Sequence, residues 1–209
     1  MNVRLPYPHV VSSIPDFVAG LAFLVTWIDP KSLGDDMVSS LFQVMLLEFI
    51  IIHSAGFMGT LIFSAIPKGK KALQLLGLGL LYSLFVAGFA FAFRSWWPVI
   101  AFWGLLFNRM MSVLTGQAEQ GKEQELVKSM WGVNTGCYLV AVFAAILLPL
   151  PALGVSPDDL AHLDISGEFV DEPHRMMAWG FLYFSMVGWF EFRLKKKQTD
   201  QHRILNIPA

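Results

Sequence analysis

Apolar residues dominate six stretches of the chain, and short polar or proline-containing segments separate them. The stretches cover residues 14–28, 38–66, 73–93, 99–114, 129–148 and 175–192. A helix that crosses the hydrocarbon core of a bilayer needs about 20 mostly apolar residues. The pattern therefore predicts an all-α membrane protein, in which about six transmembrane helices form a single bundle without a second domain.

The first stretch is the shortest of the six and carries Asp16 near its start. No small-residue cleavage site precedes Asp29, so we do not interpret this stretch as a signal peptide. We expect a short first span that could extend back to Val10, with a re-entrant or interfacial segment as the alternative. Pro15 fits the first turn of such a helix, where its missing N–H costs nothing.

Composition supports several spans, because 55% of the 209 residues are hydrophobic and only 15% are charged. The mean hydropathy is +0.55, outside the range typical of soluble globular proteins. The net charge of −1 gives no basic surface for nucleic acid. Cys137 is the only cysteine, which excludes a disulfide within the chain and a cysteine-based zinc site.

Lysine and arginine predict the orientation, because these residues concentrate in the cytoplasmic loops of membrane proteins. In a six-span topology Lys31, Arg94 and Arg175 fall on one side of the membrane. All the other lysines and arginines outside the spans fall on the opposite side. Both termini are therefore predicted to be cytoplasmic, in the inner (cytoplasmic) membrane of a bacterial-type cell. Residues 149–174 become an acidic outer loop, and residues 193–209 a basic, polar and mobile cytoplasmic tail.

We expect the chain to be organised around residues 38–66, which are nearly continuous apolar sequence. Gln43, Glu48 and His53 nevertheless lie in the middle of this stretch. An ionisable side chain near the centre of a bilayer costs at least a few kcal/mol, so it usually faces protein or water and has a partner. These residues are therefore candidates for a site inside the membrane.

Glu48 and Arg109 form the first predicted constellation. Each lies ten residues into its apolar stretch, which corresponds to a depth of about 15 Å, and both stretches run in the same direction. The opposite charges could therefore meet within the bundle. One interpretation is a buried structural ion pair that fixes how two helices dock, and the alternative is a proton or cation site in which Arg109 tunes Glu48.

His53 lies about 140° around its helix from Glu48, so the two do not share a face. Asn134 in the fifth stretch reaches a similar depth and could be its hydrogen-bond partner, and Asn108 lies beside Arg109 in the fourth stretch. A haem held by two histidines would need a second histidine within a span, and the sequence has none. No cofactor is predicted.

The acidic outer loop offers a mixed set of oxygen and nitrogen ligands for a divalent metal, namely His162, Asp164, Glu168 and His174. Their spacing matches no known metal-binding loop. A solvated acidic loop is therefore the expected state, and the metal site is the alternative.

Three functional classes remain open. The leading one is a non-enzymatic membrane component or accessory subunit, held together by the Glu48–Arg109 pair and associated with other membrane subunits or a second copy. The second is a small transporter or proton-conducting protein that uses Glu48, Arg109 and His53. The third is a membrane-embedded enzyme with His53, Asn108 and Asn134 around a lipid-facing pocket, which is disfavoured because the sequence has no hydrolase or metalloprotease motif.

Overall fold

The computed structural model describes residues 8–115, 121–163 and 165–205. Every regular element in these residues is a helix, which confirms the all-α prediction. The elements are α1 (Pro8–Ile28), α2 (Met37–Ile62), α3 (Lys68–Ala92), α4 (Trp97–Thr115), α5 (Gly121–Leu147), the 3₁₀ turn η2 (Pro157–Leu160), α6 (Glu168–Asp171) and α7 (Pro173–Leu205).

Five of these helices are long and apolar enough to cross a membrane. The qualifying segments are Val10–Ile28, Met37–Ile62, Lys68–Ala92, Trp97–Thr115 and Lys128–Leu147. The sixth predicted stretch lies within α7 and is not among them, because the uncharged run between Arg175 and Glu191 is short and α7 is less apolar than the five segments. The count of six spans therefore stays a prediction.

One expectation about a helix end is wrong. Pro15 lies inside α1 instead of in its first turn, because the helix begins at Pro8. The polar tail from residue 193 continues α7 as a helix to Leu205, and its mobility stays a prediction. Lysine, glutamine and arginine have high helix propensity, and neither glycine nor proline interrupts the helix after Phe192.

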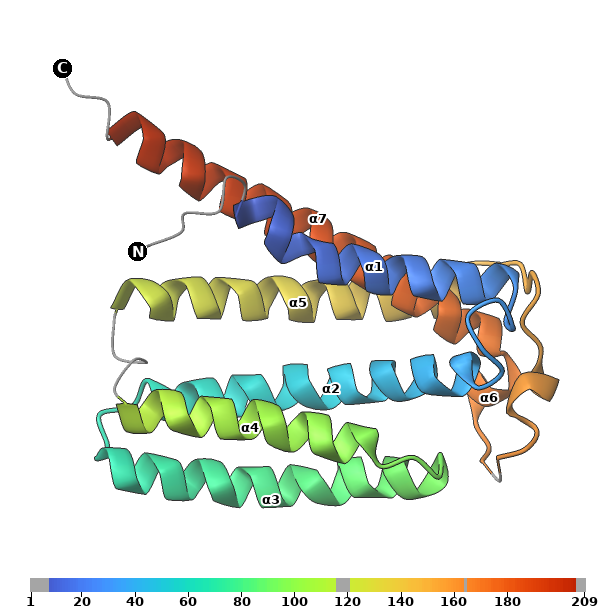
Figure 1. The fold of residues 1–209 in the computed structure, drawn as a ribbon, viewed down its shortest axis with the longest axis horizontal. Helices are drawn as coiled ribbons and strands as arrows, with labels where there is room; N and C mark the ends of the chain where they lie inside the picture. The colour runs from blue at the N-terminus through green and yellow to red at the C-terminus, as the bar shows by residue number, and fades with distance from the viewer. Residues whose placement is uncertain (1–7, 116–120, 164, 206–209) are drawn as a thin grey trace.

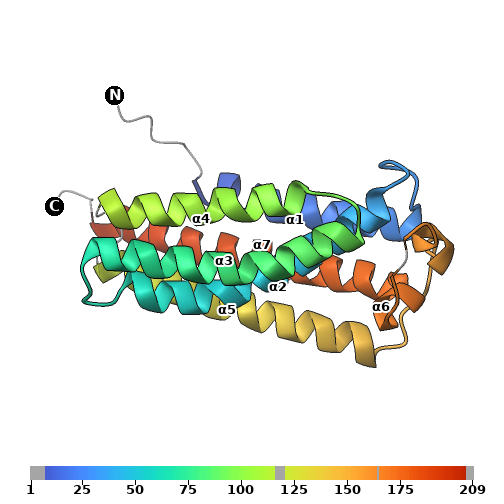
Figure 2. The same cartoon turned by 90° about the horizontal axis from the view of Figure 1, so that it is seen from below.

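Helix α2 lies in the middle of the bundle, with α1, α5 and α7 on one side and the α3–α4 hairpin on the other (Figure 1). Figure 2 shows the long helices running side by side along the same axis. One hydrophobic cluster joins α2 to α1, α5 and α7, and a second joins α2 to α3 and α4. Since α2 is apolar on all its faces, it can pack on both sides at once. Helix α2 therefore contributes residues to both hydrophobic clusters.

The two ends of the bundle differ in charge. Helix α1 begins and α7 ends at the same end as the turn between α2 and α3, where Lys68, Lys70 and Lys71 lie (Figure 1). We call this the basic end. The opposite, acidic end carries η2 and α6. Which end faces the cytoplasm stays a prediction.

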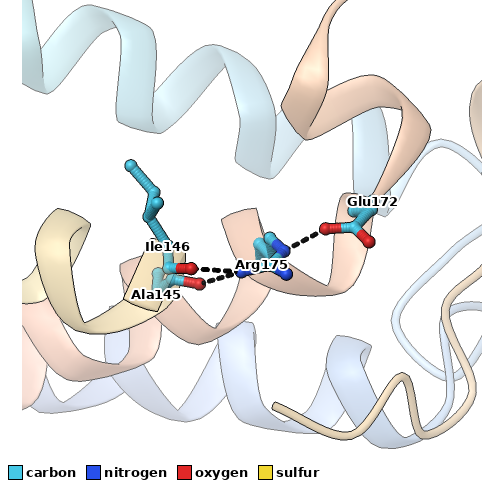
Figure 3. Close-up of polar contacts among 4 residues, drawn as sticks. All are labelled: Ala145, Ile146, Glu172 and Arg175. Carbon is cyan, nitrogen blue, oxygen red and sulfur yellow. Dashed lines mark hydrogen bonds and ion pairs between the residues drawn. The ribbon is translucent and has the colours of Figure 1, made fainter. Parts of the chain in front are cut away.

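Arg175 ties α5 to α7 at the acidic end (Figure 3). Its Nη1 donates hydrogen bonds to the carbonyl oxygens of Ala145 (3.0 Å) and Ile146 (2.6 Å), and its Nε forms an ion pair with Glu172. The last carbonyls of a helix have no partner within the helix and attract cations. Arg175 therefore caps α5 from a different helix.

Gly79 allows α3 to approach α4. A Cβ atom at Gly79 would lie 2.2 Å from a methyl carbon of the buried Leu106, whereas one at Gly77 would meet nothing within 4 Å. We therefore expect Gly79→Ala to lower the free energy of unfolding by about 1–3 kcal/mol through overpacking. Gly77→Ala is the matched control and should not destabilise the helix. Unfolding of both variants in mixed detergent micelles tests this, and equal stabilities would contradict the close packing.

Candidate functional site

The structure gives Glu48 and Arg109 different partners. Glu48 Oε2 accepts a hydrogen bond from the hydroxyl of Tyr183 (3.1 Å), and Arg109 Nη1 lies 3.2 Å from the sulfur of Met58. Among the described residues, the salt bridges join Glu172 to Arg175 and Glu191 to Lys195. The predicted Glu48–Arg109 ion pair is therefore not formed.

The depth estimate failed because α4 is shorter than α2, with 19 residues against 26. Met58 and Arg109 line the same small cavity between the two helices. Arg109 is thus level with a residue ten positions beyond Glu48, which separates the two charges by about 15 Å along the bundle axis. Glu48 and Arg109 are equally far from the starts of their apolar stretches, but those starts are not at the same level in the bundle.

Glu48 instead belongs to a line of polar side chains between α1, α2 and α7. The carboxyl group of Asp16 on α1 lies within hydrogen-bonding reach of Glu191 on α7 and interacts electrostatically with Glu48. Glu191 also pairs with Lys195, one turn further along α7. We call this line the carboxyl chain; its members are Glu48, Tyr183, Asp16, Glu191 and Lys195.

The helices of the carboxyl chain approach each other closely where Asp16 faces α7. A Cβ atom at Gly188 would lie 3.2 Å from the Cβ of Asp16. A hydrogen bond between Asp16 and Glu191 requires one proton, because an ionised carboxylate has only acceptors. No partner was predicted for Asp16. Since Asp16 and Glu191 each interrupt an apolar stretch, pairing the first stretch with the last would have brought them together.

Several buried polar atoms of α2, α5 and α7 have no hydrogen-bond partner among the described residues. They include Gln43 Oε1, Asn134 Oδ1 and Trp179 Nε1. Gln43 precedes Glu48 by five residues and Trp179 precedes Tyr183 by four, so both lie nearer the acidic end by about 6–8 Å. Buried polar atoms of this kind are typical binding positions for internal water.

Asn134 is level with Glu48, not in contact with His53. Trp131 Nε1 donates to the carbonyl of Ile52 (2.9 Å) and the Tyr138 hydroxyl to that of Met45 (3.2 Å), which fixes the register of α5 against α2. The partner of His53 is on α3, where the Tyr82 hydroxyl lies 2.9 Å from its Nδ1.

His53 also lines an open groove of about 820 Å³ between α2 and α5. Aromatic side chains dominate this groove, including Phe49, Phe57 and Trp131, and Lys128 is part of the α5 wall. Neither Glu48 nor the predicted site residues Asn108 and Asn134 are among the lining residues. Asn108 is exposed on α4. The groove and the carboxyl chain are thus separate features.

The candidate metal ligands lie in separate elements. His162 follows η2, Glu168 begins α6 and His174 is in the first turn of α7, while Asp164 lies outside the described residues. Burial lowers the pKa of the His174 imidazole, opposed by Glu172 and reinforced by Arg175. Within the described ranges no three histidine, cysteine, aspartate or glutamate side chains gather as a metal site would require. The metal site stays a prediction.

Comparison of the chain with protein-family models, curated proteins and solved structures finds no significant match. The function therefore has to be argued from the geometry of the two features above.

Proposed function

We propose that this chain is a multi-pass membrane protein that conducts protons along the carboxyl chain. One observation carries the proposal. Glu48 lies near the middle of α2, and its hydrogen-bond partner is the neutral hydroxyl of Tyr183, with no cation paired to it among the described residues. Carboxyl groups inside membrane proteins frequently belong to proton relays.

The carboxyl chain leads from the middle of the bundle to its basic end. Along α7, Tyr183 and Lys195 are twelve residues apart, or about 18 Å. Tyr183, Asp16 and Glu191 can each hold and release a proton between these points. Toward the acidic end, the unpartnered Nε1 of Trp179, one turn before Tyr183 on the same face of α7, supports a hydrated continuation of the path.

The other two functional classes have less support. The accessory-subunit hypothesis relied on a sealed Glu48–Arg109 pair, and the two residues have different partners. The enzyme hypothesis needs His53 and the two asparagines around one pocket, yet neither Asn108 nor Asn134 lines the groove. Arg109 and His53 are not members of the proposed proton path.

The test is proton flux into proteoliposomes that contain a pH-sensitive dye, driven by a potassium diffusion potential. The wild type should acidify the lumen faster than empty liposomes, and Glu48→Gln should lower this flux at least about tenfold, as for loss of a proton-transferring group. Glutamine can still accept the hydrogen bond from Tyr183, so the variant should fold. Glu168→Gln is the matched control, because it makes the same substitution on α6 at the acidic end.

Two results would overturn the proposal. One is wild-type flux no greater than that of empty liposomes. The other is a Glu48→Gln variant, shown to be folded by its detergent melting curve, that conducts as well as the wild type.

A further inference from the structure

The groove between α2 and α5 has the size, length and charge of a lipid site. Its volume of about 820 Å³ lies within the range of about 300–1,000 Å³ typical of ligand pockets. Lys128 is the only fixed charge among its lining residues, and none of them is acidic. An occupant with an apolar body and an anionic group complements this lining.

The α5 wall of the groove matches one leaflet of a bilayer in length. It runs from Lys128 to Leu139, which corresponds to about 16 Å. One leaflet contributes about half of the 30 Å hydrocarbon core. Lys128 and Trp131 are at the end of this wall nearer the basic end, and lysine and tryptophan are residues that anchor proteins at a membrane surface.

Two polar side chains line the groove from opposite walls. The register set by Trp131 and Ile52 places His53 of α2 within about one turn of Lys128 of α5. His53 Nδ1 contacts the Tyr82 hydroxyl, which leaves Nε2 for another partner. The long side chain of Lys128, at the start of the apolar segment of α5, can reach a phosphate at the membrane surface, whereas His53 lies inside α2 at the depth of the acyl chains.

We propose that the groove binds one anionic phospholipid from the leaflet at the basic end. Its phosphate lies at Lys128, and one acyl chain follows α5 past Gly132 toward Leu139. This inference rests on the membrane-spanning part of the proposed function but not on proton conduction.

A glycine in the groove can be replaced by a larger residue to block the proposed lipid site. A Cβ atom at Gly132 would meet nothing within 4 Å, and the same holds for Gly88 on the outer surface of α3. Gly132 lines the groove and Gly88 does not. Gly132→Leu therefore places a side chain where we expect the acyl chain, and Gly88→Leu is the matched control.

The experiment is native mass spectrometry of the purified full chain, titrated in detergent with phosphatidylglycerol or with phosphatidylcholine. We expect one phosphatidylglycerol per chain, bound at least fivefold more tightly than phosphatidylcholine. Lys128→Gln should weaken phosphatidylglycerol about fivefold, in line with the effect of one lysine near an anionic lipid. Gly132→Leu should abolish stoichiometric binding, and Gly88→Leu should retain it.

Equal binding of the two lipids would overturn the anionic headgroup assignment, and lipid retained by Gly132→Leu would overturn the location. A wild-type dimer that Gly132→Leu converts to monomer would identify a second copy of the chain as the occupant and would overturn the proposal. These readouts require no proton flux, so failure of the lipid site and failure of the proton path are distinguishable.

Discussion

Replacement of Asp16 by asparagine is expected to preserve the stability of the folded protein and to lower its proton flux at least about tenfold. The asparagine amide can donate to Glu191, so the contact between α1 and α7 survives without a shared proton. Glu191 keeps its ion pair with Lys195. The substitution therefore removes a proton carrier but not the packing around it.

Detergent melting curves and the proteoliposome assay measure the two quantities on the same preparation. A purely structural role for Asp16 predicts parallel changes in stability and flux. If Asp16→Asn melts like the wild type and also conducts like it, Asp16 is not part of the path, and protons reach Glu48 by another route.

Gly180→Ala is expected to be among the most destabilising single-methyl additions in the bundle. The new Cβ would lie 2.2–2.5 Å from three ring carbons of Phe23, which is fully buried in α1 and stacks on Phe184. A buried ring cannot withdraw without moving its neighbours, so we expect a loss of about 3 kcal/mol in the free energy of unfolding.

The control is Gly136→Ala on α5, where a Cβ atom meets nothing within 4 Å. A second variant tests the cause, since Phe23→Leu combined with Gly180→Ala should recover part of the loss. Unfolding in mixed micelles of the wild type, the single variants Gly180→Ala, Phe23→Leu and Gly136→Ala, and the double variant gives the comparison. Additive effects would show that Phe23 and Gly180 do not share one contact.

The helices were predictable because apolar residues run in long blocks, and length alone distinguishes these from buried strands or loops. The central role of α2 was predictable for a related reason, since a helix that is apolar on all faces can be covered on all faces. The end of α7 was not predictable from hydropathy. Its polar residues have high helix propensity, and a hydropathy pattern does not measure helix propensity.

The partner of Glu48 could not be predicted, because depth and charge do not determine which faces of two helices meet. Arg109 satisfied both criteria and still lies level with Met58, since α4 is shorter than α2 and depths counted from the starts of the two stretches do not correspond. The hydroxyl of Tyr183 gives no charge signal in the sequence. Only the packing of α7 against α2 identifies it as the partner of Glu48.

The pairing of the first helix with the last has a consequence for biosynthesis. Helix α1 packs mainly against α7, and Tyr183 is synthesised 135 residues after Glu48. At 5–20 residues per second, the ribosome needs about 7–27 s to cover that distance. During this interval Asp16 and Glu48 are already made while their partners on α7 do not exist. If the chain is inserted as proposed, we therefore expect it to depend on the insertion machinery to shelter two acidic groups, and we expect a chain truncated before α7 to be degraded.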